Sequence, residues 1–89
     1  MKLRDRFVIT HGENGKTYAV ATGDAARYFN GKLELNEMGL FIFEQLMSHT
    51  DESRIADAIT KEYAVDRLTA LSDIKKFIRQ LRSADIIED

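Results

Sequence analysis

Residues 33–39 read LELNEMG, and this stretch decides the fold because its hydrophobic pattern changes period within seven residues. Residues 32–35 alternate polar and apolar side chains, which predicts a short strand with both leucines on one face. Asn36 is a good helix N-cap, and Glu37 suits the positive end of a helix dipole. The stretch therefore predicts a strand that turns directly into a helix over residues 38–48.

Apolar side chains wrap most of that helix, which is typical of a central helix that neighbours cover on several sides. They are Met38, Leu40, Phe41, Ile42, Phe43, Leu46 and Met47. Two further helices follow, the first capped by Thr50 or Asp51 and the second by Asp66. Their apolar stripes are Ile55, Ala56, Ile59 and Tyr63 in one, and Leu68, Leu71, Ile74, Phe77, Ile78 and Leu81 in the other.

Upstream of the strand, the sequence predicts a β-hairpin. Residues 7–11 alternate, residues 17–22 are rich in β-formers, and Asn14-Gly15 between them favours a type I′ turn with positive φ at both centres. Asp24 is a candidate cap for a single helical turn over residues 25–29, which Asn30-Gly31 would end. At the other end of the chain, residues 85–88 form either a short strand or a tail that packs two isoleucines into the core.

Strands that precede helices in the chain predict an α+β fold, and three helices with short connections favour a winged helix-turn-helix-like domain. The length of 89 residues fits one domain over residues 1–89. The net charge is −2 and there is no cysteine, which excludes disulfides, thiolate nucleophiles and Cys-ligated metal. The sequence has no signal peptide and no apolar run long enough for a membrane span, so we expect a cytoplasmic protein.

The sequence offers few candidate catalytic residues. There are two histidines. His11 sits beside the predicted hairpin turn. His49 neighbours Ser48, but adjacent helix residues point apart, so no catalytic relay forms locally. The two histidines also lack any recognised metal-ligand spacing. The glycines do not cluster between a strand and a helix as a phosphate loop requires. We therefore expect no enzyme activity, no cofactor and no metal site.

A basic face on the third helix is the one feature that suggests nucleic acid. Lys75, Arg79 and Arg82 lie at i, i+4 and i+7 with Lys76 alongside, where a winged helix-turn-helix domain would place its recognition helix. The acidic balance of the chain argues against this interpretation, and a solvated helix face explains the same residues. DNA binding therefore stands as an alternative.

The string LELNEMG, followed by LFIFEQL over residues 40–46, resembles the PqqD family. The similarity continues through TGDAARYFNG over residues 22–31, the capped helix TDESRIADAITKEY, the Asp73-Ile74, Phe77-Ile78 and Leu81 rhythm, and the ending SADIIED, and so spans residues 7–87. Met38 stands where the family commonly has Thr, and Asp85 where it commonly has Gly.

The resemblance implies a three-stranded antiparallel sheet backed by a three-helix bundle. It also implies a non-catalytic role, in which the domain holds the leader segment of a ribosomally made precursor peptide and presents it to a modifying enzyme, often a radical enzyme. The strand over residues 32–35 would be an edge strand that accepts the peptide as an added strand. The expected peptide-binding residues are Lys32, Leu33, Glu34 and Leu35 through their backbone, and Asp73, Lys76, Phe77 and Gln80 through their side chains. The same edge strand could instead pair with its own copy, so a homodimer is a third possibility.

Overall fold

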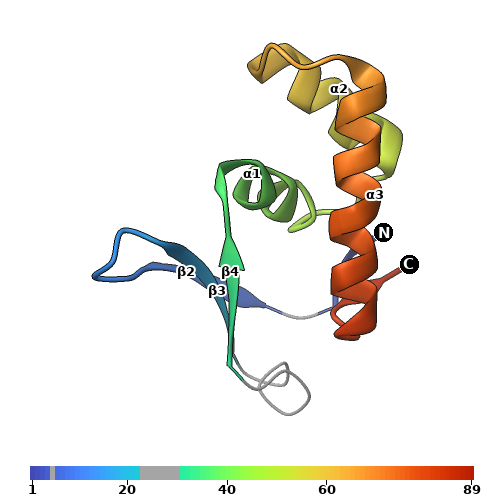
Figure 1. Ribbon diagram of the computed structural model, residues 1–89. Coiled ribbons are helices and arrows are strands. Elements are labelled where there is room, and N and C mark those ends of the chain that lie inside the picture. The colour runs from blue at the N-terminus through green and yellow to red at the C-terminus, as the bar shows by residue number, and fades with distance from the viewer. Residues whose placement is uncertain (5, 23–30) are drawn as a thin grey trace.

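Two small sheets and three helices make up the part of the chain that the computed structural model describes, residues 1–4, 6–22 and 31–89 (Figure 1). In chain order the elements are β1 (Lys2–Leu3), β2 (Phe7–His11), β3 (Thr17–Ala21), β4 (Lys32–Leu35), α1 (Glu37–Gln45), α2 (Glu52–Glu62), α3 (Arg67–Ser83) and β5 (Ile87–Glu88). The predicted α+β arrangement is confirmed. The helical turn expected over residues 25–29 lies outside the described residues.

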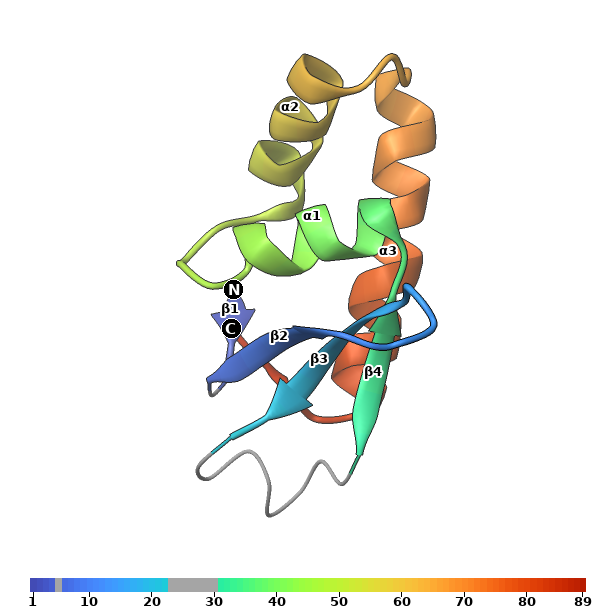
Figure 2. The same cartoon turned by 90° about the vertical axis from the view of Figure 1, so that its left-hand side faces the viewer.

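The larger sheet is antiparallel with the strand order β2-β3-β4, so β4 forms one of its edges. Side chains alternate between its faces, and the face with Phe7, Ala19 and Leu35 is buried. Figure 2 shows α1 crossing above this sheet while α3 runs behind β4. The expected three-stranded sheet, with the helices packed beside it, is therefore confirmed.

The hairpin between β2 and β3 uses a different turn from the predicted one. The Gly15 amide donates to the Gly12 carbonyl over 3.1 Å, and the Gly12 amide donates to the Lys16 carbonyl over 2.8 Å. Gly15 has a φ of +78°, whereas Asn14 is not among the residues with positive φ. The loop is therefore a three-residue connection with its left-handed residue at Gly15, and the prediction of a type I′ turn with two positive φ angles was wrong.

Each helix begins at a capping side chain. The carboxamide or carboxylate oxygens of Asn36, Asp51 and Asp66 accept the amide hydrogens of residues 39, 54 and 69 over 2.7–2.8 Å. These caps are the predicted ones, because short side-chain acceptors satisfy amides that the helix leaves without a partner. The first helix ends at Gln45, three residues before the predicted end.

The core is one cluster that runs from the buried sheet face through α1 to α2 and α3. The largest fully buried side chains include Phe43 from α1, Leu46 directly after it, and Ile74 and Leu81 from α3. Phe7 of β2 meets Phe43 edge to face, with ring centroids 5.5 Å apart. Two apolar residues expected to pack inward do not. Leu68, in the first turn of α3, is 81% exposed and Met47, beyond the end of α1, is 52% exposed.

The two ends of the chain pair with each other, which the sequence did not predict for the N-terminal end. Lys2 lies opposite Glu88 in an antiparallel ladder of β1 with β5, and the ends lie side by side in Figures 1 and 2. For residues 85–88 both predicted alternatives hold, because Ile86 and Ile87 are buried and β5 is a strand.

Asp85 makes the turn that leads from α3 into β5. Its φ is +60°, and the amides of Asp85 and Ile86 donate to the carbonyls of Arg82 and Leu81. This pair of bonds is the Schellman motif, which favours glycine at the position that Asp85 occupies.

Candidate functional site

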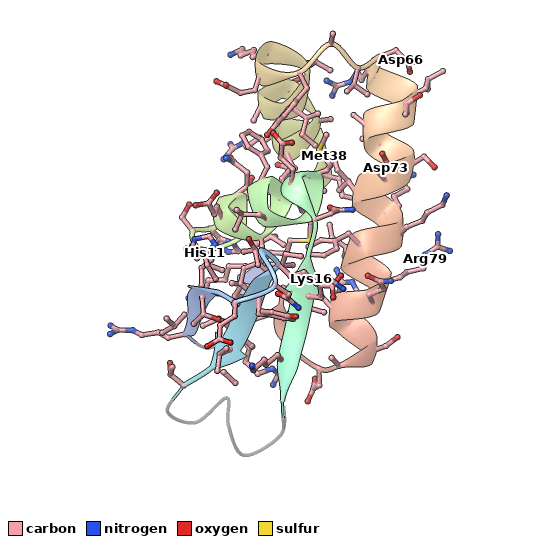
Figure 3. The ribbon with its side chains drawn as sticks, turned by 60° about the vertical axis from the view of Figure 1, so that its left-hand side comes forward. His11, Lys16, Met38, Asp66, Asp73 and Arg79 are labelled. Carbon is pink, nitrogen blue, oxygen red and sulfur yellow. The ribbon has the colours of Figure 1, made fainter. Side chains whose placement is uncertain are left out.

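A pocket of about 240 Å³ lies between the start of α1 and the middle of α3. Its lining residues are Asn36, Met38, Gly39, Ile42, Asp73, Lys76, Phe77 and Gln80. The four side chains predicted on the third helix are therefore brought together around one pocket. Figure 3 shows Met38 and Asp73 on the two facing elements.

The pocket combines an apolar interior with a polar rim. Ile42 is buried, and Met38 and Phe77 are half-buried and pack against the core. Asp73 and Lys76 on the rim are exposed, as is Gln80. Within the described chain, no hydrogen bond or ion pair engages the side chains of these three rim residues. The rim therefore keeps both signs of charge and an amide available for a ligand.

Gly39 allows close packing at the pocket. A Cβ at this position would lie 3.1 Å from Oδ1 of Asn36, closer than most real Cβ contacts, and 3.4 Å from Cε1 of Phe77, at the near limit of ordinary van der Waals contact. The Gly39 amide also donates to Asn36 over 2.7 Å. The absence of a side chain at Gly39 therefore allows Phe77 and the helix cap to come together at the pocket.

Hydrogen bonds at the two ends of the β2–β3 pair show which neighbouring strand the backbone amide and carbonyl of each β3 residue face. The Gly12 amide donates to the Lys16 carbonyl, and the Thr22 amide donates to the Arg6 carbonyl. Because bonded and non-bonded pairs alternate in an antiparallel ladder, the even-numbered residues of β3 turn their backbone groups to β2. Its odd-numbered residues turn theirs to β4.

The same alternation identifies the open backbone groups of β4. Leu33 and Leu35 lie opposite odd-numbered residues of β3, so their amides and carbonyls face the sheet. The amides and carbonyls of Lys32 and Glu34 consequently face outward along the edge. The four predicted strand residues do not line the pocket themselves, but β4 leads directly into it at Asn36.

Side chains on the outer face of the sheet hold the charged residues of β4 in place. The ammonium of Lys32 lies 5.2 Å from the ring centroid of Tyr18, and Nζ of Lys16 lies 3.3 Å from Oε1 of Glu34. Both contacts are made with β3 or its turn, not with the helices. They draw the side chains of Lys32 and Glu34 away from the backbone edge.

The basic residues of the third helix do not form one surface. Arg82 forms a two-pronged ion pair with Asp89 over 2.8 and 2.9 Å, and Lys76 lines the pocket. Lys75 and Arg79 are exposed, and Arg79 points away from α1 and β4 (Figure 3). The four cations of the DNA-binding alternative are thus divided among an internal ion pair, the pocket and a solvated face.

The two histidines also lie apart. His11 contacts the hydroxyl of Thr17 over 3.2 Å in the hairpin, whereas His49 follows α1 near the N-terminus. Residues 1–4, 6–22 and 31–89 contain no cluster of three or more His or acidic residues that could hold a metal ion. Nor does the described part of the chain contain a helix long and apolar enough to cross a membrane.

Four lining residues were not among the predicted site residues. Asn36 had been interpreted as a cap, Gly39 as a close-packing position, and Met38 and Ile42 as core. The signal that could have found them is the phase of α1, because residues 38, 39 and 42 share one side of a helix. Met38 also has the flexible thioether side chain that adapts to varied ligands.

The fold and the pocket define a class of small winged helix-turn-helix-like domains in which an edge strand runs into a hollow between two helices. The family model of coenzyme PQQ synthesis protein D (PqqD) matches residues 7–87, and the chain belongs to this family. A comparison with curated proteins found no match. Among solved structures, the chain is similar to TbiB1 in complex with the TbiA(beta) leader peptide. The sequence identity is 27% and the TM-score 0.73, over 99% of this chain and 95% of that one.

Proposed function

We propose that this protein is a non-catalytic module that binds the leader segment of a ribosomally made precursor peptide and presents it to a modifying enzyme, of the radical type in many members of the family. The observation that carries the proposal is the junction of an open strand edge with an apolar pocket at Asn36. The similarity to TbiB1, whose solved structure contains a leader peptide, supports it.

The peptide would bind as a fourth strand beside β4. Its backbone would exchange hydrogen bonds with the outward amides and carbonyls of Lys32 and Glu34, which supply affinity without regard to sequence. One apolar peptide side chain would enter the pocket against Phe77. Asp73 and Lys76, one turn apart on α3, would select charged neighbours of that side chain.

The site is too small to enclose a whole precursor peptide, which supports a role in presenting the peptide to a second protein. A four-residue strand spans only about 13 Å, so most of a leader peptide would extend beyond β4. A segment held in this way is restrained at one place and free elsewhere. The remaining peptide could therefore reach the catalytic site of a second protein while its leader stays bound.

A titration with a leader peptide tests the proposal. The probe is the leader portion of a short open reading frame adjacent to this gene, and the readout is the shift of backbone amide signals in NMR spectra. We expect saturable shifts at residues 32–36 and 73–80 with a Kd of about 1 μM or lower, or about −8 kcal/mol.

Two variants at Glu34 separate strand addition from other modes of binding. Glu34→Pro removes an outward amide, which an edge strand tolerates because that amide makes no bond to β3. We expect it to abolish peptide binding while the helices persist. Glu34→Ala removes the ion pair with Lys16 but keeps the amide, and should bind almost as wild type does. Undiminished binding by Glu34→Pro would rule out strand addition.

A further inference from the structure

A second hollow, of about 670 Å³, lies where β1, the start of β2 and the residues after α1 meet. These segments lie together on the left of Figure 2. Its lining includes the buried side chains of Leu3 and Phe7 and the exposed side chains of Val8 and Met47. Val8 is 49% and Met47 52% exposed, and Leu68 is the one other large apolar residue counted as exposed in the described chain. Two of the three exposed apolar side chains therefore line one hollow.

The charged residues that the structure describes on the rim of this hollow are basic. Lys2, Arg4 and Arg6 line it, and none of the described residues that line it is acidic, although the whole chain carries a net charge of −2. Asp85 lies 2.9 Å from Arg4, from outside the hollow. Within the described residues, Arg6 has no carboxylate within ion-pair distance. We call this surface the basic hollow.

The basic hollow and the candidate peptide pocket share no lining residue. One is built from β1, β2 and the end of the α1 segment, and the other from the start of α1 and the middle of α3. A ligand in the pocket would therefore leave the basic hollow open. The protein could hold two partners at the same time.

We propose that the basic hollow docks the peptide-modifying enzyme, through a surface segment in which an apolar side chain is flanked by carboxylates. This inference rests on the proposed function. An apolar centre within a charged rim is the arrangement of a protein interface, in which the centre supplies affinity and the rim selects the partner. Charge complementarity indicates an acidic partner surface, because Lys2 and Arg6 have no ion-pair partner among the described residues while Arg4 is paired with Asp85.

The test measures binding of the modifying enzyme encoded beside this gene, with leader peptide present, to the wild type and three variants. Met47→Glu and Arg6→Glu place negative charge in the basic hollow. Leu68→Glu is the control, since Leu68 is also apolar and exposed (81%, against 52% for Met47) but lies in the first turn of α3, outside the lining of the basic hollow. We expect each of the first two variants to raise the Kd for the enzyme at least tenfold, and Leu68→Glu to change it less than twofold.

A parallel NMR titration of the same variants with leader peptide separates this inference from the proposed function. We expect all three variants to bind peptide as the wild type does. If the wild type binds no peptide, the proposed function is wrong. If peptide binding is normal but the enzyme does not bind, or binds Met47→Glu and Arg6→Glu as well as the wild type, the docking surface is wrong. Sedimentation that shows a wild-type dimer and a Met47→Glu monomer would overturn it in favour of a second copy as the occupant.

Discussion

The ring of Phe77 lies against the backbone of Gly39, so that a methyl group added to Gly39 would stand 3.4 Å from Cε1 of Phe77. This contact joins the first turn of α1 to the middle of α3 at the candidate pocket. Phe77 is half-buried and packs against the core while it also lines the pocket. A methyl group at Gly39 would therefore crowd the Asn36 cap at 3.1 Å and touch Phe77, and both of these residues line the pocket.

We expect Gly39→Ala to weaken leader-peptide binding several-fold while changing the free energy of unfolding by less than about 1 kcal/mol. Alanine favours the helix by about 1 kcal/mol over glycine, but its methyl group must displace Phe77 or the Asn36 cap. Urea unfolding and peptide titration measure the two effects. Glu44→Ala, on an exposed part of α1, is the control for the substitution itself. A stabilised Gly39→Ala protein with unchanged peptide affinity would show that Phe77 is not held by this contact.

The positive φ of Asp85 gives a second prediction. Substitution by Gly, Asn or Val removes the 2.9 Å ion pair with Arg4 in every case, so differences among the three variants report on the backbone. A β-branched residue in the left-handed region costs about 1–2 kcal/mol. We expect urea unfolding to rank the variants Gly, Asn, Val in falling stability, with about 1–2 kcal/mol between the first and the last. Equal stability of Asp85→Gly and Asp85→Val would contradict the left-handed turn.

The helix cap at Asp66 should make the stability of the fold depend on pH. The hydrogen bond from the Thr69 amide, and after it the bond from the Thr69 hydroxyl, lower the pKa of the Asp66 carboxyl. Because the folded-state pKa is the lower one, the ionised cap stabilises the fold above the unfolded pKa of about 3.9. This contribution to stability is lost as the pH falls toward the pKa of Asp66 in the folded state. Asp66→Asn keeps a capping oxygen without the charge.

We therefore expect the Tm of the wild type to exceed that of Asp66→Asn at pH 6, and the difference to shrink below pH 4. Thermal unfolding followed by circular dichroism at pH 6, 4, 3 and 2 measures it. A difference that stays constant over this range would assign the role of Asp66 to something other than its charge.

Two residues on α3 test which side of that helix faces the core. Leu68 is 81% exposed, whereas Ile74 is fully buried, although both belong to the apolar stripe that the sequence predicts. We expect Ile74→Ala to cost about 2–5 kcal/mol and Leu68→Ala to change the free energy of unfolding by no more than about 0.5 kcal/mol. Denaturant titration of both variants gives the values. Comparable losses at both positions would mean that Leu68 is packed in solution.

The features that the sequence predicted correctly depend on neighbouring residues. Asn36, Asp51 and Asp66 mark helix starts because each bonds an amide three residues along the chain. The short strand before Asn36 follows from the alternation of its side chains. The grouping of Asp73 with Lys76 and the other predicted residues of α3 follows from helical periodicity, since they lie three and four residues apart.

The features that were missed depend on distant parts of the chain. A two-residue strand at Lys2–Leu3 has no periodicity of its own and exists only because Ile87–Glu88 lies beside it. Leu68 is exposed although Ala70, in the same turn of α3, is buried, so Leu68 lies on the side of that turn that the rest of the described chain does not cover. Met38 belongs to the pocket because α3 leaves its side of α1 partly open, and no local pattern in residues 38–48 records this.

The final prediction separates peptide binding from DNA binding by reversing two charges on one helix. Lys76 lines the pocket, while Arg79, three residues on, points into solvent away from it. If the pocket binds peptide, Lys76→Glu should alter the Kd for leader peptide by about tenfold, equivalent to about 1.4 kcal/mol, because the reversed charge meets the same peptide side chain. Arg79→Glu should leave peptide affinity unchanged. Fluorescence anisotropy of a labelled peptide at 50 and 200 mM salt measures the peptide affinity of both variants.

A duplex DNA probe in the same assay tests the alternative. If α3 bound DNA, phosphate contacts would make Arg79→Glu the more damaging change, and the affinity would fall steeply with salt. We expect the duplex to bind neither variant nor the wild type. Of the four cations of the DNA-binding alternative, Arg82 is already paired with Asp89, and the other three, Lys75, Lys76 and Arg79, are too few to offset the net negative charge of the chain.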